Sequence, residues 1–148
     1  MDDIFTAKQK LVEAQKNYDA GKYNNAVAYC NQALNFIRFG SDSDTAKEIY
    51  FLLGLAHLEL GTSYSEWDLN DGILACKYFD KVIEIDENFV QAYLYHGLAI
   101  LKWGTGGVYV ANYDMAISDF KKVLELDPNN ESARKYLNFA VKKSEERN

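Results

Sequence analysis

The sequence predicts an all-α fold of about seven helices, and three observations support this prediction. Apolar residues recur every three or four positions through most of the 148-residue chain, which is the spacing of one helix face. The chain has nine glycines and one proline, too few for a turn-rich β fold. One packing pattern also returns three times. At this length we expect a single domain with a real hydrophobic core.

The helices are placed by apolar spacing and by residues that start or stop a helix. The predicted ranges are residues 3–20, 23–38, 45–60, 71–85, 92–103, 112–128 and 131–146. Gly21, Gly61 and Gly104 end the first, third and fifth helices. Pro128 ends the sixth helix, and Asn130 is placed to cap the seventh.

The third predicted helix differs from the others. Thr45 and Glu48 form a capping box that starts it. Its residues are apolar on nearly all sides, which is typical of a helix buried between neighbours. Polar or glycine-rich residues at 40–44, 62–70 and 105–111 are predicted as loops.

Composition and charge limit the partners and the location. The chain has 22 acidic and 16 scattered basic residues, a net charge of −6. This balance disfavours nucleic acid or a membrane surface as the main partner, because both reward clustered Lys and Arg. The acidic start contains no long apolar run, so we expect no signal peptide, no transmembrane span and a cytoplasmic location. Cys30 and Cys76 lie at apolar positions of different helices, where we expect free thiols.

The sequence shows no pattern of a catalytic, cofactor or metal site, so we do not expect an enzyme. His57 and His96 lie inside apolar helices, where we expect satisfied core or groove side chains. No Cys or His pair has the spacing of metal ligands. Glycines near residue 105 lack the lysine and the flanking strand of a phosphate-binding loop.

The second, fourth and sixth predicted helices share one packing pattern. A small residue is followed four positions later by a large or soft apolar residue, and then by an apolar pair. The three copies are Ala26, Cys30, Ala33 and Leu34; Ala75, Phe79, Val82 and Ile83; and Ala116, Phe120, Val123 and Leu124. The preceding helices carry small residues at matching places, namely Ala14, Gly54 and Gly97. Small residues allow two helix axes to approach to about 8–10 Å.

This pattern resembles the tetratricopeptide repeat, a helix-turn-helix unit of about 34 residues. The family's core motif is complete in Tyr113, Ala116, Phe120 and Pro128. The middle copy has Gly72 and Glu87 in place of the tyrosine and the proline, and the first copy has Arg38 in place of the proline.

The resemblance implies a right-handed α-α superhelix, a short solenoid of three repeats and a terminal capping helix within a single domain. The repeats cover about residues 7–40, 47–89 with an insertion at 62–70, and 90–130 with an insertion at 105–111; the capping helix covers 131–146.

In this family the first helix of each repeat lines a concave groove that binds peptides. The resemblance therefore implies a protein-interaction module, a scaffold or chaperone-like adaptor without a cofactor. One subtype clamps a C-terminal carboxylate with Lys, Asn and Arg; the matching positions here are Leu11, Gln15, Leu52, Gln91 and Tyr95. None of these residues is basic. A carboxylate needs charge-assisted donors to leave water, so we do not expect the clamp.

An apolar groove remains, and it is predicted to bind an amphipathic helix or an extended apolar segment. The predicted groove consists of Leu11, Val12, Gln15, Tyr18, Phe51, Leu52, Leu55, Leu58, Gln91, Leu94, Tyr95, Leu98 and Leu101. Asp19, Glu48 and Glu59 are expected at its rim. The alternative is that some of these residues belong to the core.

The two insertions depart from the family's repeat length. Aromatic residues in or beside them form a predicted insertion edge, made of Tyr64, Trp67, Trp103 and Tyr109. The insertions are either tolerated surface loops, since added loop length costs little, or an edge that contacts a partner. In a second functional hypothesis, the groove or this edge forms a homo-oligomer interface.

Overall fold

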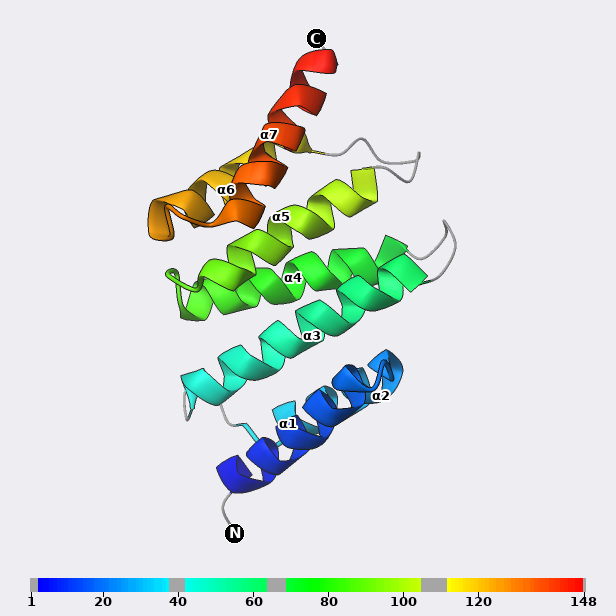
Figure 1. Cartoon of the computed structure of the whole chain (residues 1–148). Helices are drawn as coiled ribbons and strands as arrows, with labels where there is room; N and C mark the ends of the chain where they lie inside the picture. The colour runs from blue at the N-terminus through cyan, green and yellow to red at the C-terminus, as the bar shows by residue number, and fades with distance from the viewer. Residues whose placement is uncertain (1–2, 38–41, 64–68, 105–111, 148) are drawn as a thin grey trace. The chain divides into compact units, whose positions relative to one another are not determined.

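A computed structural model describes residues 3–37, 42–63, 69–104 and 112–147 of the chain (Figure 1). All regular secondary structure in these residues is α-helical. The helices are α1 (Asp3–Asp19), α2 (Tyr23–Leu34), α3 (Ser43–Ser63), α4 (Leu69–Ile85), α5 (Val90–Gly104), α6 (Tyr113–Leu126) and α7 (Glu131–Glu146). The all-α class and the expected helix count are thus confirmed. The chain divides into two compact units, Met1–Asp86 (unit 1) and Glu87–Asn148 (unit 2).

Unit 1 contains α1 to α4, and neighbours in sequence pack side by side. α1 lies against α2, α2 against α3 and α3 against α4, while α1 also meets α3. One cluster of buried residues joins the first three helices: Ala14, Cys30, Ala33, Ile49, Leu52 and Leu53. Because α3 has helices on several sides, its apolar residues are buried nearly all round, as the sequence predicts.

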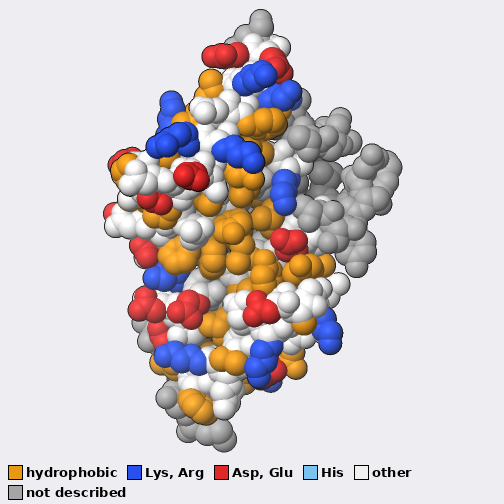
Figure 2. All heavy atoms as spheres, viewed as in Figure 1, with side chains coloured by type: hydrophobic (Ala, Val, Ile, Leu, Met, Phe, Trp, Pro, Cys, Tyr) orange, Lys and Arg blue, Asp and Glu red, His pale blue; other side chains and the backbone are white. Residues whose placement is uncertain are grey.

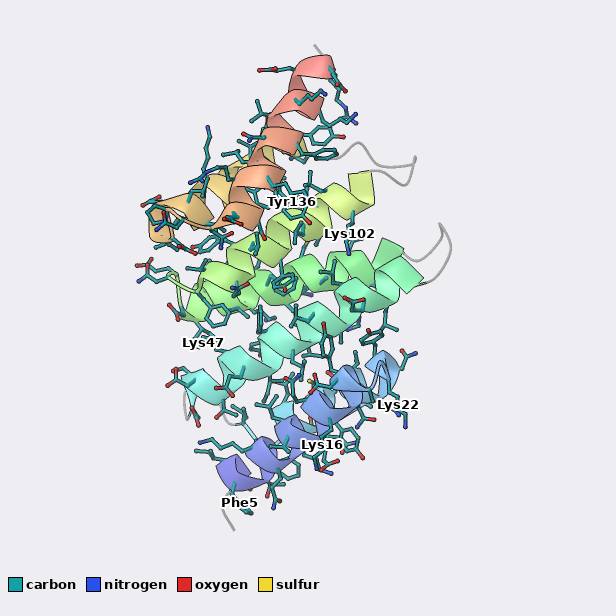
Figure 3. All side chains as sticks on the ribbon, viewed as in Figure 1. Phe5, Lys16, Lys22, Lys47, Lys102 and Tyr136 are labelled. Atoms are coloured by element: carbon teal, nitrogen blue, oxygen red, sulfur yellow. The ribbon has the colours of Figure 1, made fainter. Side chains whose placement is uncertain are left out.

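Unit 2 contains α5 to α7 and is held together through α6. α6 packs against both α5 and α7, and α5 also touches α7. Phe120 and Val123 of α6 are fully buried, as are Ala133 and Ala140 of α7. The ring of Tyr136, labelled in Figure 3, stacks on Phe120 with 5.9 Å between centroids.

Polar side chains cap the starts of the helices, and the residue that caps α3 differs from the prediction. The predicted capping box is wrong: Thr45 is 3% exposed and lies inside α3. Asp42 caps the helix instead, because its carboxylate accepts hydrogen bonds from the Thr45 hydroxyl at 2.7 Å and the Thr45 N–H at 3.1 Å. These bonds hold the pKa of Asp42 below its ordinary value of 3.8.

The caps of α6 and α7 follow simple rules. Asn130 accepts a hydrogen bond from the Ala133 N–H at 2.9 Å, which confirms its predicted role. Asn112 does the same for the Met115 N–H at 3.2 Å. Each asparagine satisfies one of the N–H groups that the first helical turn leaves unpaired.

Two helix ends also differ from the prediction. α2 ends at Leu34 rather than at residue 38, and the next residues form tight turns in which N–H groups bond to carbonyls three positions back. Gly61 does not end α3, which continues to Ser63. Gly61 lies beside Asp71 and Gly72 of α4, so packing outweighs the low helix propensity of glycine, about 1 kcal/mol.

The predicted insertions are only partly described. α3 extends to Ser63 and α4 begins at Leu69, so both ends of the 62–70 insertion are helical. Residues 64–68 and 105–111 lie outside the described residues. In the described part of the chain, no helix has the length and apolar character needed to cross a membrane.

Candidate partner-binding surface

Contacts between small and large side chains set how closely the two helices of a repeat approach. A Cβ atom added to Gly54 of α3 would lie 2.5 Å from Cε1 of Phe79 on α4. A Cβ atom added to Gly97 of α5 would lie 2.8 Å from Cε1 of Phe120 on α6. In the first copy the matching residues are Ala14 and Cys30, members of one buried cluster. In the second and third copies a glycine therefore lies opposite a phenylalanine, whereas in the first copy an alanine is paired with the smaller cysteine.

The two histidines also join the first and second helices of a repeat. Nδ1 of His57 lies 2.7 Å from a carboxylate oxygen of Asp71, and Nδ1 of His96 lies 2.6 Å from one of Asp119. A carboxylate oxygen can only accept, so each Nδ1 carries the hydrogen. Both histidines are buried, at 8% and 6% exposure. They belong to the interior of the repeats and offer no surface to a ligand.

Lys47 ties the start of α3 to the end of α4. Its Nζ lies 3.3 Å from a carboxylate oxygen of Asp86 and 3.4 Å from one of Asp44. The hydrogen bond to Asp86 raises the pKa of Lys47 above its ordinary value of 10.5. Figure 3 shows Lys47 at the edge of unit 1. Its charge is engaged within the unit.

The face of α3 that the other helices of unit 1 cover least is narrow, and even there the Phe51 ring meets Phe79 of α4 with 5.9 Å between centroids. It consists of Glu48, Phe51, Leu55 and Glu59, which share one side of the helix by their spacing. Glu48 is exposed and the other three are half-buried. Every other residue from Ile49 to Leu60 is buried except Tyr50, whose ring stacks on Tyr78. We call these four residues the α3 stripe.

α5 presents a similar face in unit 2. Its members are Gln91, Tyr95, Leu98 and Lys102, of which the first and last are exposed and the middle two half-buried. Every other residue from Ala92 to Leu101 is buried except Tyr93, whose hydroxyl donates to the Glu87 carbonyl at 2.8 Å. We call these four residues the α5 stripe. Figure 2 shows hydrophobic side chains at the surface of both α3 and α5, with charged ones beside them.

α1 contributes less apolar surface than the sequence suggests. Leu11 and Tyr18 are half-buried because they pack against the core cluster of unit 1. The Tyr18 ring also meets Tyr23 edge-on at 5.4 Å. Gln15 is exposed and donates a hydrogen bond to Asp19, and Val12 is 53% exposed. Among the predicted groove residues of α1, only Val12 is an open apolar position.

Four of the predicted groove residues are core. Leu52, Leu58, Leu94 and Leu101 are 3%, 5%, 7% and 6% exposed, so they leave almost no side chain for a partner to touch. The alternative considered from the sequence, that part of the groove set is core, holds for them. The structure thus reduces the open apolar positions of α3 and α5 to Phe51, Leu55, Tyr95 and Leu98.

The predicted insertion edge is not placed. Tyr64, Trp67 and Tyr109 lie outside the described residues. Trp103 lies in the last turn of α5, but its side chain is also outside them. Of the charged residues on the stripes, Glu48 and Glu59 are expected from the sequence and Lys102 is missed. The repeat pattern could have predicted a charged residue at this place, because Lys102 occupies the same position in its repeat as Asp19 and Glu59.

The described side chains form no group of three or more His, Cys, Asp or Glu that could hold a metal ion. Cys30 and Cys76 are free thiols, as expected. Burial raises the pKa of the Cys30 thiol from 9.0 to about 12, so it stays protonated near neutral pH. A protonated, enclosed thiol is a packing group.

Comparison with known proteins agrees with the repeat pattern. A family model described as tetratricopeptide repeat matches residues 110–130. This segment covers the copy with Tyr113, Ala116, Phe120 and Pro128, in which the motif is complete.

Solved structures of similar fold cover nearly the whole chain. The tetratricopeptide-repeat domain of Arabidopsis OM64 is 21% identical, with a TM-score of 0.73 over 95% of this chain and 98% of that one. A C-terminal tetratricopeptide-repeat domain of a putative FK506-binding protein from Plasmodium falciparum is 23% identical, with a TM-score of 0.69 over 97% and 91%. The second such domain of human RPAP3, solved with an HSP70 peptide, is 19% identical, with a TM-score of 0.66 over 94% and 95%. This chain therefore carries one matched tetratricopeptide repeat and shares the fold of tetratricopeptide-repeat domains.

Proposed function

We propose that this chain is a protein-interaction module in which the α3 stripe of unit 1 and the α5 stripe of unit 2 each contact a peptide or a helical segment of a partner. One observation carries the proposal: Phe51, Leu55, Tyr95 and Leu98 are half-buried, whereas most other residues at 49–60 and 92–101 are buried. Large apolar side chains that stay open on such helices are a mark of an interaction site. The repeat match and the human RPAP3 domain, which was solved with an HSP70 peptide, support this class of function.

The binding energy would come from burying apolar anchors, at about 25 cal/mol per Å² before the costs of association. None of the positions that match the family's carboxylate clamp is basic, and Leu52 among them is buried. We therefore propose an apolar segment, rather than a terminal carboxylate, as the ligand. A scaffold or chaperone-like adaptor in the cytoplasm, without catalysis, is the role that we propose.

Site-specific photocrosslinking in cells tests the proposal. We expect a photoreactive phenylalanine analogue at Phe51, and separately one at Leu98, to crosslink a partner. The exposed positions Asn31 on α2 and Ser118 on α6 serve as matched control sites. Equal crosslinking from the control sites would contradict the proposal.

Charge substitution tests the same surface. Leu55→Asp and Leu98→Asp each place a carboxylate where an apolar anchor should bind, so we expect at least a roughly tenfold loss of partner capture. Asn31→Asp and Ser118→Asp should leave capture unchanged. Circular dichroism should show the same helical signal in all four variants. Undiminished capture by both Leu→Asp variants would rule out the stripes as the binding surface.

The second candidate is self-assembly, and open apolar side chains outside the stripes favour it. Phe5 and Val12 of α1 are 60% and 53% exposed, and Figure 3 shows Phe5 near the start of the chain. Light scattering over a dilution series separates the two functions. A constant monomer mass agrees with partner binding, whereas a dimer that Leu55→Asp dissociates would assign the α3 stripe to a homo-oligomer interface.

A further inference from the structure

We propose that the exposed face of α2 is the contact surface for a second copy of this chain, in which two α2 helices pack antiparallel about Ala28. The face consists of Asn24, Ala28, Asn31, Gln32 and Asn35, which are all exposed and share one side of the helix by their spacing. We call these five residues the α2 amide face. None of them belongs to the α3 or α5 stripe, so the proposal goes beyond the partner binding proposed above.

The α2 amide face carries no charge, and this sets α2 apart from the other helices. Residues 23–37 contain no Asp, Glu, Lys or Arg. Each of the other six helices in the described part of the chain exposes at least one charged side chain. Two cations lie beside the face: Lys22, labelled in Figure 3, precedes the helix, and Nζ of Lys10 on α1 lies 5.7 Å from the ring centroid of Tyr29. The face is therefore exposed without the charges that usually solvate an exposed helix.

The amide side chains of this face have no partner within the described residues. Asn25, at the edge of the face, donates a hydrogen bond to Asn17 of α1 at 3.4 Å, but the four amides of the face itself form none with the described part of the chain. Helix stability does not explain the asparagines, because asparagine is a weaker helix former than lysine or glutamate. Solubility also favours charged side chains at exposed positions. Contact with another surface explains this row of amides better.

The chemistry of an amide selects the kind of surface that can cover it. Each Asn or Gln side chain both donates and accepts hydrogen bonds. An apolar surface would bury these groups without partners, and a charged surface would lose its water without gaining an opposite charge. The matching surface is uncharged and carries donors and acceptors of its own. The α2 amide face of a second copy meets both conditions.

The net charge of the chain restricts where two copies can meet. Residues 1–86 contain 14 acidic and 8 basic residues, so the whole net charge of −6 belongs to unit 1. Two copies of this unit therefore repel each other in most orientations. The repulsion is weakest where neither surface carries a charge, and α2 provides such a surface.

The spacing of the face fits a two-fold helix pair. Ala28 lies near its middle, and its small side chain allows two helix axes to approach to about 8–10 Å. With the helices antiparallel, Asn24 of one copy comes near Asn31 of the other, because these residues lie about one turn before and one turn after Ala28. The two-fold axis makes this amide contact twice.

The size of the interface sets the expected affinity. α2 has 12 residues and is about 18 Å long, so a pair of such helices forms a small interface, below about 1,200 Å². We expect a reversible dimer with a Kd of roughly 10–100 μM. Well below that concentration the chain is monomeric, so Asn31→Asp remains a control for partner capture. A crosslink from Asn31 to a second copy has twice the mass of the chain, which distinguishes it from a crosslink to a partner.

Sedimentation equilibrium over a series of protein concentrations tests the proposal. We expect the mass to rise from that of a monomer towards that of a dimer around the Kd given above. Because the amide contacts form against charge repulsion, high salt should tighten the dimer by roughly two- to fivefold. An interface made of ion pairs would weaken instead, and that result would contradict the proposal.

Substitutions at Ala28 assign the dimer to the α2 amide face. Ala28→Glu and Ala28→Lys each bring two like charges together at the two-fold axis, so each variant alone should dimerise at least roughly tenfold more weakly. Mixed in equal amounts, the two variants should associate again, because opposite charges then meet. Ser118→Glu, at an exposed position of α6, is the matched control and should leave the dimer unchanged. Circular dichroism should show the same helical signal in all three variants, because Glu and Lys are good helix formers.

Several results would overturn the proposal. A chain that stays monomeric far above the expected Kd would exclude the dimer and leave the proposed binding at the stripes untouched. A dimer that Ala28→Glu leaves intact would lie on another face: dissociation by Val12→Glu would assign it to α1, and dissociation by Leu55→Asp to the α3 stripe. Failure of the mixed Ala28 variants to associate would exclude the two-fold contact through this residue.

Discussion

Cys30 shows what a single residue does in this fold. It occupies the place held by Phe79 and Phe120 in the other two copies, and like them it is fully buried. A thiol in such a place cannot easily ionise, because the surrounding apolar groups do not solvate a thiolate. Its raised pKa of about 12 is therefore a consequence of packing.

This burial predicts how stability changes with pH. The unfolded thiol ionises near 9.0 and the folded thiol near 12, so between these values the unfolded state loses a proton that the folded state keeps. The free energy of unfolding should then fall as pH rises above 9, by about 1.4 kcal/mol per pH unit from this group. Urea unfolding at about pH 8 and about pH 10 measures the fall.

Cys30→Ala is the reference for that measurement, because it removes this ionisation and retains the ionisations of Tyr and Lys. We expect a smaller fall in the variant than in the natural chain. An equal fall in both proteins would mean that the Cys30 thiol ionises as readily in the folded state as in the unfolded one.

At the residue scale, the candidate site was predicted only in part. The repeat resemblance predicts Phe51 and Leu55 in the groove, and both are half-buried on α3. Leu52 and Leu58 fit the same apolar pattern but are buried. Helical spacing gives the direction of a side chain but not the neighbour that covers it, so these two could not be separated from the open pair without the structure.

Between elements, the contact of Gly54 on α3 with Phe79 on α4 fixes the spacing of the two helices. Gly54→Ala should destabilise the protein by about 1–3 kcal/mol, because the added methyl group would overlap a ring that has no free space around it. This cost exceeds the gain of about 1 kcal/mol in helix propensity. Urea unfolding of the variant measures the difference.

Gly61→Ala is the matched control within the same helix. Its added Cβ would meet Asp71 and Gly72 only at 3.4 Å, an ordinary contact. We expect it to be neutral or to stabilise the protein by up to about 1 kcal/mol. If Gly54→Ala were equally harmless, α3 and α4 would have to be free to move apart.

At the element scale, the sequence predicted which helices exist better than where they end. Apolar spacing depends on many residues, and it predicts each of the seven helices in the described residues. A helix end depends on one or two local groups, and here tertiary packing determines which of the possible end residues is used. Gly61 was expected to stop α3 but is carried through by the contact with α4, and the cap of α3 lies at Asp42 rather than at Thr45.

At the scale of the whole molecule, the chain divides into two units, each with its own buried phenylalanine. Repeat proteins derive their stability from contacts within and between neighbouring repeats, so a core substitution should destabilise the helices around it most. Phe120→Ala should cost about 3–5 kcal/mol and should speed amide hydrogen exchange most in α5 to α7. Phe79→Ala should act most in α3 and α4. Hydrogen exchange with mass spectrometry distinguishes these patterns; the same change in every helix would show that the chain opens only as a whole.

The pairing of small and large residues between helices has a consequence for how such chains can be rebuilt. A first helix that carries Ala14 has lost the space that Phe79 or Phe120 needs, and a first helix that carries Gly54 would leave a void beside Cys30. The helices of this protein are therefore not interchangeable parts. A hybrid protein that recombines these helices, whether it arises by gene duplication or is built in the laboratory, must take both residues of each contacting pair from the same repeat. Otherwise the two helices will clash or leave a void.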